Sequence, residues 1–267
     1  MLDRSRLAAL AVTIGAVAFA AFTTGGTAGA ASSVHYVALG DSYSSGDGAG
    51  NYSDGSCRES SNAYPVLWAN AHAPATFTNE TCSGATTSSV ISTELGALSS
   101  ATTLVSISIG GNDVGFASVM ETCVLGSTSS CVNAVNSAEA QAQSTLPAAL
   151  NTVLSDIKAD APNAKIVVLD YPQFYDLSKS STCIGLSTTD RTALNGGAAL
   201  LDSEISAAAS RNGDTFVDVV PHFAGHQICD SGSYLNSVNI FDIESSYHPN
   251  ASGQANGYLP AFASAAG

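Results

Sequence analysis

A serine and a histidine, separated by most of the chain, have the side-chain types needed to attack a carbonyl group. Ser42 lies in the segment GDSYSSG, where glycines let the backbone turn sharply and keep bulk away from the hydroxyl. A serine hydroxyl is a poor nucleophile until a base removes its proton. His248, in the segment SSYHPN, lies at the entry of a helix-like tail, from which its ring can project into a cleft. We therefore expect Ser42 to be the nucleophile and His248 its general base.

Attack on a carbonyl also requires fixed hydrogen-bond donors for the negative charge that develops on oxygen. Gly84, in the segment CSGAT, can bring a bare backbone N–H close to a substrate. Asn112, in IGGNDVGF, can donate from its side-chain amide without adding a charge, although alone it would be interpreted as a turn residue after two glycines. The neighbouring Asp41 and Asp113 are interpreted as turn-stabilising acceptors rather than proton carriers.

The other four histidines have structural interpretations that compete with a catalytic one. His35 begins a predicted strand, His72 lies in a short helix-like run, and His222 lies at a strand exit. For His226, a role in a substrate-binding loop and a structural role are both open. His248 is therefore the preferred base.

Strand-like and helix-like segments alternate along the chain and must position these residues. Runs rich in β-formers predict strands over 34–39, 103–109, 165–169 and 215–220, with a weaker candidate at 75–79. Helices are predicted over 134–158 and over 188–210, the second capped by Ser187 or Thr188. This alternation predicts a mainly parallel sheet covered by helices on both faces, with the ligand site beyond the carboxyl ends of the strands. Ser42 and Asn112 each follow such an end.

The sequence resembles the SGNH-hydrolase family, also called GDSL esterases and lipases, and in particular its secreted actinobacterial lipases and phospholipases. The four segments quoted above occur in the order typical of that family, and the resemblance covers nearly the whole chain after residue 30. It implies a flavodoxin-like three-layer α/β fold with Ser42 as nucleophile and His248 as base. It also implies an oxyanion hole formed by the amides of Ser42 and Gly84 and by the side chain of Asn112.

One position departs from the pattern of the family. Many members carry an aspartate three residues before the histidine, where this chain has Ser245. Glu244 and Asp242 are near but at other offsets. Some relatives with the same gap use a backbone carbonyl, so we expect the carbonyl of Ser245 to orient His248.

The six cysteines all lie after residue 30. An even number of cysteines in an exported chain predicts three disulfides and leaves several pairings open, whereas a zinc site is disfavoured by the ligand spacing. The resemblance includes a three-disulfide arrangement. Pairing in chain order, which we predict, would join Cys57 to Cys82, Cys123 to Cys131, and Cys183 to Cys229. We expect no metal and no cofactor.

The net charge and the first thirty residues limit what the protein can bind and where it can act. The 267 residues carry a net charge of −14, which opposes binding to nucleic acid and to anionic membranes. Residues 1–30 combine two arginines, an apolar run and a small-residue site, which predicts a cleaved secretory signal rather than a membrane anchor. Residues 31–267 are then expected to form one domain of a secreted monomer with no stable membrane insertion.

The expected reaction is hydrolysis of carboxylic esters through an acyl-enzyme on Ser42. Apolar residues over 114–120 and 174–175 favour fatty-acyl esters such as acylglycerols or phospholipids as substrates. Three alternatives remain at this stage: a sugar O-deacetylase of the same superfamily, a non-catalytic secreted binding module, and a metal-dependent hydrolase.

Overall fold

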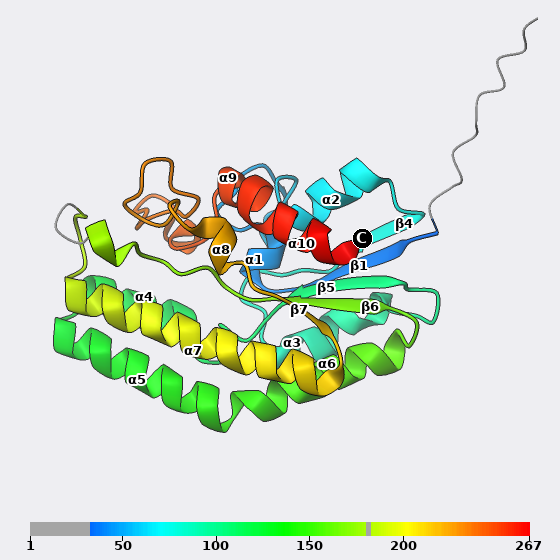
Figure 1. Ribbon diagram of the computed structural model, residues 1–267, viewed down its shortest axis with the longest axis horizontal. Coiled ribbons are helices and arrows are strands. Elements are labelled where there is room, and N and C mark those ends of the chain that lie inside the picture. Colours follow the sequence, from blue (N-terminus) through cyan, green and yellow to red (C-terminus); the bar gives the residue numbers. More distant parts are fainter. Residues whose placement is uncertain (1–32, 180–182) are drawn as a thin grey trace, which may run out of the picture. The chain divides into compact units, whose positions relative to one another are not determined.

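Five parallel strands form the central sheet of the protein (Figure 1). The structure is a computed structural model that describes residues 33–179 and 183–267, so the predicted signal segment 1–30 lies outside the described residues. The sheet has the order β4-β1-β5-β6-β7. Its strands are β1 (His35–Gly40), β4 (Thr76–Asn79), β5 (Leu104–Ser108), β6 (Lys165–Leu169) and β7 (Thr215–Val217).

The strand order places the site at the centre of the sheet. Numbered by their succession within this sheet, the strands run 2-1-3-4-5, which is the flavodoxin-like order. In such a sheet the chain leaves the first and third strands in opposite directions, and a crevice opens between their carboxyl ends. Here those strands are β1 and β5, paired so that Gly40 lies opposite Ser108. The predicted fold class is confirmed, as are all five predicted strands to within three residues at each end.

Helices cover both faces of the sheet, with α2 and α10 on one face and α6 and α7 on the other (Figure 1). On the buried face of α6, residues at helical spacing pack into the core, among them Leu150, Val153, Leu154 and Ile157. The α-helices are α1 (Ser42–Ser45), α2 (Tyr64–His72), α3 (Thr87–Ser89), α4 (Phe116–Leu125), α5 (Thr128–Ser144), α6 (Leu146–Asp160), α7 (Thr188–Asn212), α8 (Val220–Phe223), α9 (Ala251–Gly253) and α10 (Leu259–Ala266). Short π and 3-10 turns are η1 (Val90–Glu94), η2 (Leu95–Ala97), η3 (Leu177–Lys179), η4 (Ile243–Ser245) and η5 (Gln254–Tyr258).

The helix predicted over 134–158 is wrong in its extent, because two helices occupy this part of the chain. The first begins at Thr128 and ends at Ser144, and the second begins at Leu146. Pro147 lies in the first turn of α6, where a missing N–H does no harm, but it could not continue a preceding helix without a steric clash. The second prediction was closer, since α7 begins after a Ser187 cap as expected.

A short antiparallel hairpin, β2 (Tyr52–Asp54) and β3 (Glu59–Ser60), was not predicted from the sequence. A disulfide between Cys57 and Cys82 fastens its turn to the segment that carries Gly84. The other two disulfides join Cys123 to Cys131 and Cys183 to Cys229, so the structure has the pairing in chain order that we predicted.

Residues 33–179 and 183–267 bear on the expectations of no membrane insertion and no metal site. Within these ranges, no helix is both long and apolar enough to cross a bilayer. The same residues contain no group of three or more histidine, cysteine or acidic side chains arranged to hold a metal ion.

Candidate active site

Ser42 is the first residue of α1, directly beyond the carboxyl end of β1. Asp41 caps this helix by accepting a hydrogen bond from the backbone N–H of Tyr43 at 3.0 Å. Gly40 adopts a φ of +112°, and a Cβ there would lie 2.3 Å from the backbone oxygen of Ser108, so only glycine fits. The first N–H groups of a helix have no acceptor within the helix, which leaves the Ser42 amide available to a substrate oxygen.

The imidazole of His248 contacts the hydroxyl of Ser42 directly. Its Nε2 atom lies 2.7 Å from Ser42 Oγ, within hydrogen-bonding distance. Burial lowers the pKa of His248 below its ordinary value, although the nearby Asp47 carboxylate and the backbone carbonyls of Ser246 and Glu244 oppose this shift. The ring is therefore neutral near pH 7 and can accept the Ser42 proton.

The carbonyl that orients His248 is that of Ser246, and the prediction that it is the Ser245 carbonyl is wrong by one residue. His248 Nδ1 lies 3.0 Å from the Ser246 oxygen. The Ser245 carbonyl instead accepts the backbone N–H of His248 at 3.3 Å and the side-chain amide of Asn236 at 3.2 Å. Tyr247 between them adopts a left-handed φ of +64°, and this turn places the Ser246 carbonyl beside the ring.

Asp242 and Glu244, the two acidic residues nearest to His248 in the sequence, form ion pairs with an arginine of the hairpin. Arg58 Nη2 lies 2.7 Å from Asp242, and its Nη1 lies 3.2 Å from Glu244. The Nε of the same guanidinium donates at 2.7 Å to Asp47, a buried carboxylate just after α1. The ring nitrogens of His248 contact the Ser246 carbonyl and the Ser42 hydroxyl rather than either carboxylate, so the main chain supplies the acceptor.

Asp47 also connects the loop of the nucleophile to the loop that carries Gly84. Its second carboxylate oxygen accepts a hydrogen bond from Ser83 Oγ at 2.8 Å, and its backbone N–H donates to the Ser42 carbonyl at 3.0 Å. Together with the Arg58 ion pair, these contacts fasten three loops to one buried carboxylate. Sequence reasoning missed this role, although Asp47 lies between two glycines directly after the Ser42 segment.

Gly84 and Asn112 face the same surface pocket as Ser42 and His248, which we call the active-site pocket. Gly84 adopts a φ of +84°, and no atom lies within 4 Å of the position that a Cβ would occupy, so its backbone is open to a ligand. One N–H of the Asn112 amide donates to the Ala85 carbonyl at 2.9 Å, which fixes the side chain and leaves its second N–H for a substrate. The four predicted residues thus line one pocket.

The two aspartates beside these residues are hydrogen-bond acceptors in turns, as predicted. Asp113 accepts from the backbone N–H of Thr87 at 3.0 Å and from its hydroxyl at 2.6 Å. Asp41 accepts from Ser108 Oγ at 2.9 Å and from the hydroxyl of Tyr171. Burial raises the pKa of Asp41 to about 6 despite these donors.

Three of the other four histidines have structural partners, and the fourth, His222, is exposed in α8. His35 Nδ1 lies 2.9 Å from Thr76 Oγ1, and His72 stacks on Trp68. The ring of His226 stacks on Tyr234 with centroids 3.9 Å apart. This contact supports a structural role for His226 over a role in a substrate-binding loop.

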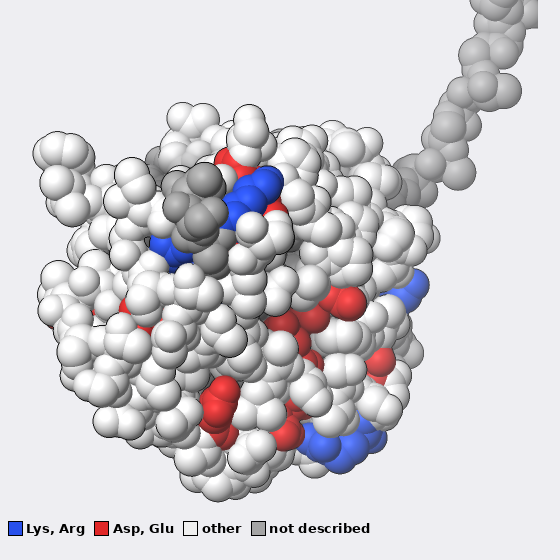
Figure 2. All heavy atoms as spheres, turned by 60° about the vertical axis from the view of Figure 1, so that its left-hand side comes forward, with Lys and Arg blue, Asp and Glu red and all other residues white. Residues whose placement is uncertain are grey.

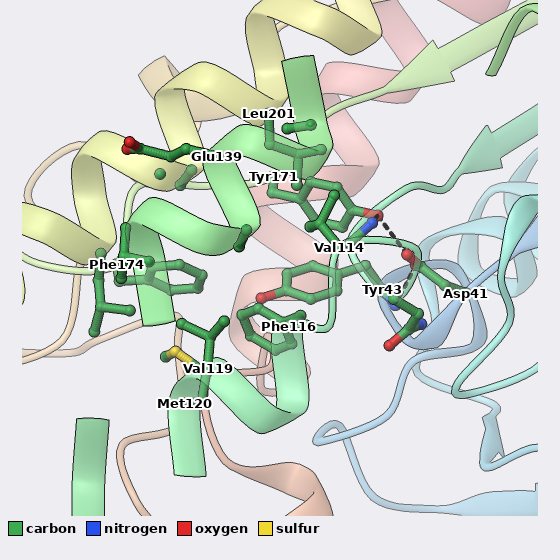
Figure 3. Close-up of a pocket in the computed structure, with 18 of the residues that line it drawn as sticks. Asp41, Tyr43, Val114, Phe116, Val119, Met120, Glu139, Tyr171, Phe174 and Leu201 are labelled. Carbon is green, nitrogen blue, oxygen red and sulfur yellow. Dashed lines mark hydrogen bonds between the residues drawn. The ribbon is translucent and has the colours of Figure 1, made fainter. Parts of the chain in front are cut away.

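An apolar cavity extends from the catalytic residues into the layer of helices. We call it the internal cavity, and it shares Ser42, Asn112, Phe116 and Met120 with the active-site pocket, so the two spaces meet at the nucleophile. Figure 3 shows the rings of Tyr43, Phe116 and Phe174 along it, between Asp41 at one end and Glu139 at the other. Small and aliphatic side chains of α5 and α7 line its far part: Val135, Ala138, Ala142, Leu194, Gly197, Ala198 and Leu201.

Comparison with known proteins places this site in a family. Residues 38–255 match the model of the GDSL-like lipase/acylhydrolase family. The chain is 51% identical to Lipase 1 of Streptomyces coelicolor over 98% of this chain and 99% of that protein. The crystal structure of phospholipase A1 from Streptomyces albidoflavus NA297 superposes with a TM-score of 0.84 at 52% identity, covering 86% of this chain and 98% of that one. The extracellular lipase of Streptomyces rimosus gives a TM-score of 0.84 at 47% identity, covering 87% and 99%. The fold, the site and these relatives agree that the chain belongs to the GDSL-like lipase/acylhydrolase family.

Proposed function

We propose that this protein hydrolyses fatty-acyl carboxylic esters, such as those of acylglycerols and phospholipids, through an acyl-enzyme on Ser42. The observation that carries the proposal is the contact of 2.7 Å between Ser42 Oγ and His248 Nε2 at the point where the internal cavity meets the active-site pocket. An ester carbonyl at this point would have its acyl chain beside an apolar space. Its alcohol part would remain in the open pocket.

In this mechanism Ser42 Oγ attacks the carbonyl carbon while its proton passes to His248 Nε2. The amides of Ser42 and Gly84 and the free N–H of Asn112 stabilise the oxyanion. Collapse of the tetrahedral intermediate breaks the bond to the alcohol oxygen, which receives the proton from His248. Water then attacks the acyl-enzyme by the same route and releases the carboxylic acid.

The Ser246 carbonyl supports His248 through both steps. By accepting the Nδ1–H it fixes the tautomer whose Nε2 is free to face Ser42. A neutral acceptor stabilises the imidazolium less than a carboxylate does, so the assembly is a serine–histidine dyad with main-chain support.

The proposal is tested by chemical labelling and by a substrate panel. A fluorophosphonate should label the wild type at Ser42 alone, and Ser42→Ala should remove nearly all ester hydrolysis, a loss of several powers of ten. Ser45→Ala, in the same turn of helix, is the matched control and should keep both labelling and activity. Labelling at another serine in the wild type would refute the assignment.

The panel discriminates the substrate classes. We expect medium- and long-chain p-nitrophenyl esters and phosphatidylcholine to be hydrolysed, and acetylated xylan to be a poor substrate because it has no chain to fill the internal cavity. Preference for acetyl groups would instead support a sugar O-deacetylase. Absence of any hydrolysis would support the binding-module alternative, and loss of activity with chelators a metal-dependent one.

We further propose that residues 1–30 are a cleaved signal and that residues 31–267 act outside the cell as a monomer. Three disulfides support an oxidising compartment, and the relative from Streptomyces rimosus is an extracellular lipase. N-terminal sequencing of the exported protein and sedimentation equilibrium test the two parts of this proposal.

A further inference from the structure

Large apolar side chains that are exposed gather beside the active-site pocket. Among the described residues, seven large hydrophobic side chains are exposed. Leu125, at the end of α4, and Ile243 line the active-site pocket. The loop that carries Ile243 adds two further exposed side chains, Ile240 and Phe241. We call these four residues the mouth patch; their exposed fractions are 77% for Leu125, 79% for Ile240, 93% for Phe241 and 64% for Ile243. Soluble proteins rarely expose such side chains together without a partner.

The loop is built so that its apolar side chains face outward. Its tip, residues 240–243, is closed at the base by Asn239, whose backbone N–H donates to Ser246 Oγ at 2.9 Å and whose amide donates to Ser245 Oγ at 3.2 Å. Between the apolar residues, the carboxylates of Asp242 and Glu244 turn back to Arg58. Both acidic side chains of the loop are thereby paired with Arg58, while Phe241 and its apolar neighbours remain exposed to solvent.

The loop is also joined directly to the catalytic base. Ser246, which closes the loop, is the residue whose carbonyl lies 3.0 Å from His248 Nδ1. A surface that contacts the tip would therefore lie at the entrance to the reaction site. This continuity distinguishes the mouth patch from scattered apolar residues such as Ile91, which lines neither the active-site pocket nor the internal cavity.

Charge indicates which surface the mouth patch fits. The chain has eight basic and 22 acidic residues, and a net charge of −14 repels anionic lipid. Arg58, the basic residue beside the tip, already bonds three carboxylates. Figure 2 shows that most of the face drawn there carries neither basic nor acidic side chains. Attraction to a lipid surface must then come from apolar contact.

We propose that the mouth patch docks the protein onto uncharged or zwitterionic lipid surfaces and holds Ser42 at the ester layer. This inference rests on the proposed function, because it assigns a lipid aggregate as the form in which the substrate is met. Docking inserts the tip among headgroups and needs no change in the catalytic residues. Esters that are dissolved as single molecules do not depend on it.

The test measures binding separately from hydrolysis. In an inactive Ser42→Ala background, vesicles of dialkyl phosphatidylcholine, which has ether bonds in place of esters, are mixed with the protein and sedimented. Ile240→Ser combined with Phe241→Ser should lower the partition coefficient at least about tenfold, since two apolar side chains no longer enter the interface. Ile91→Ser is the matched control and should bind like its parent. Addition of dialkyl phosphatidylglycerol should weaken binding.

In the active protein, the same double variant should keep kcat/KM for p-nitrophenyl acetate within about twofold while activity on phosphatidylcholine vesicles falls about tenfold or more. Unchanged vesicle binding, or tighter binding to anionic vesicles, would overturn the proposal. A wild-type dimer that the double variant dissociates would show that the mouth patch is covered by a second copy instead. If the inactive protein binds vesicles but the wild type cleaves no fatty-acyl ester, the proposed function is wrong and docking stands.

Discussion

Replacement of Ala198 by leucine should shorten the acyl chains that the enzyme prefers. Ala198 is buried on α7 and lines the far part of the internal cavity. A leucine side chain occupies the space of roughly three further methylene groups, and each methylene kept out of an apolar site costs about 0.8 kcal/mol, or roughly fourfold in rate. We therefore expect kcat/KM for the palmitoyl ester to fall about 50-fold, whereas the acetyl ester should change by less than about twofold.

The assay is kcat/KM over p-nitrophenyl esters from acetyl to palmitoyl. Ala199→Leu makes the same change at an exposed position of the same helix and is the matched control, since it should leave the profile unaltered. Overpacking in a full core would cost about 1–3 kcal/mol, so thermal unfolding of both variants shows whether the cavity accommodates the new side chain. An unchanged ratio of palmitoyl to acetyl rates in folded Ala198→Leu would refute the assignment of the internal cavity to the acyl chain.

Further predictions concern the donors, the orienting group and the buried carboxylates. Asn112→Ala should lower kcat by roughly 10²–10³-fold with little change in KM, because one oxyanion donor is lost; steady-state kinetics on the folded variant check this. Glu244→Gln should keep kcat within about tenfold, since that side chain pairs with Arg58, whereas a true triad carboxylate would cost ~10⁴. Arg58→Gln should raise the pKa of His248, because the guanidinium lowers it, so the acid limb of the kcat/KM profile should move to higher pH; a shift to lower pH would contradict this. Glu94, whose pKa burial raises to about 8, binds its proton more tightly in the folded state, so it should lower the free energy of unfolding as pH rises from about 5 to 8. Glu94→Gln should flatten that dependence in thermal unfolding.

Much of the fold could be predicted because the three central strands, β1, β5 and β6, are short, largely apolar runs that are buried. The runs over 165–169 and 34–39 differ from the structure by at most one residue at either end. The break before Pro147 was missed because hydrophobic periodicity continues across it, although a proline in that position favours a helix start over a helix interior. The hairpin of β2 and β3 has no apolar pattern of its own from which it could be predicted. A disulfide and the ion pairs of Arg58 hold it in place instead.

The parts of the candidate site that depend on a single short segment could be predicted from the sequence. Ser42 and Asn112 follow strand ends, so the sheet itself brings them together. The partners of Asp41 and of Glu94 could not be predicted, since Tyr171 and Gly40 lie on other segments and no local pattern joins them. The choice between two adjacent carbonyls depends on one backbone angle at a single residue, which sequence patterns do not specify.

The use of a carbonyl behind His248 has a consequence for the pH at which the base is available. A carboxylate in that place would raise the pKa of the imidazole, whereas the Ser246 carbonyl is neutral and does so less. Burial then dominates and keeps the resting ring uncharged. Asp242 and Glu244, the acidic residues just before His248 in the sequence, do not restore the missing charge, because Arg58 holds both in ion pairs. The dyad therefore stabilises the imidazolium less than a triad would. Its base, however, stays deprotonated at pH values below the ordinary pKa of histidine. Activity should therefore persist into mildly acidic conditions.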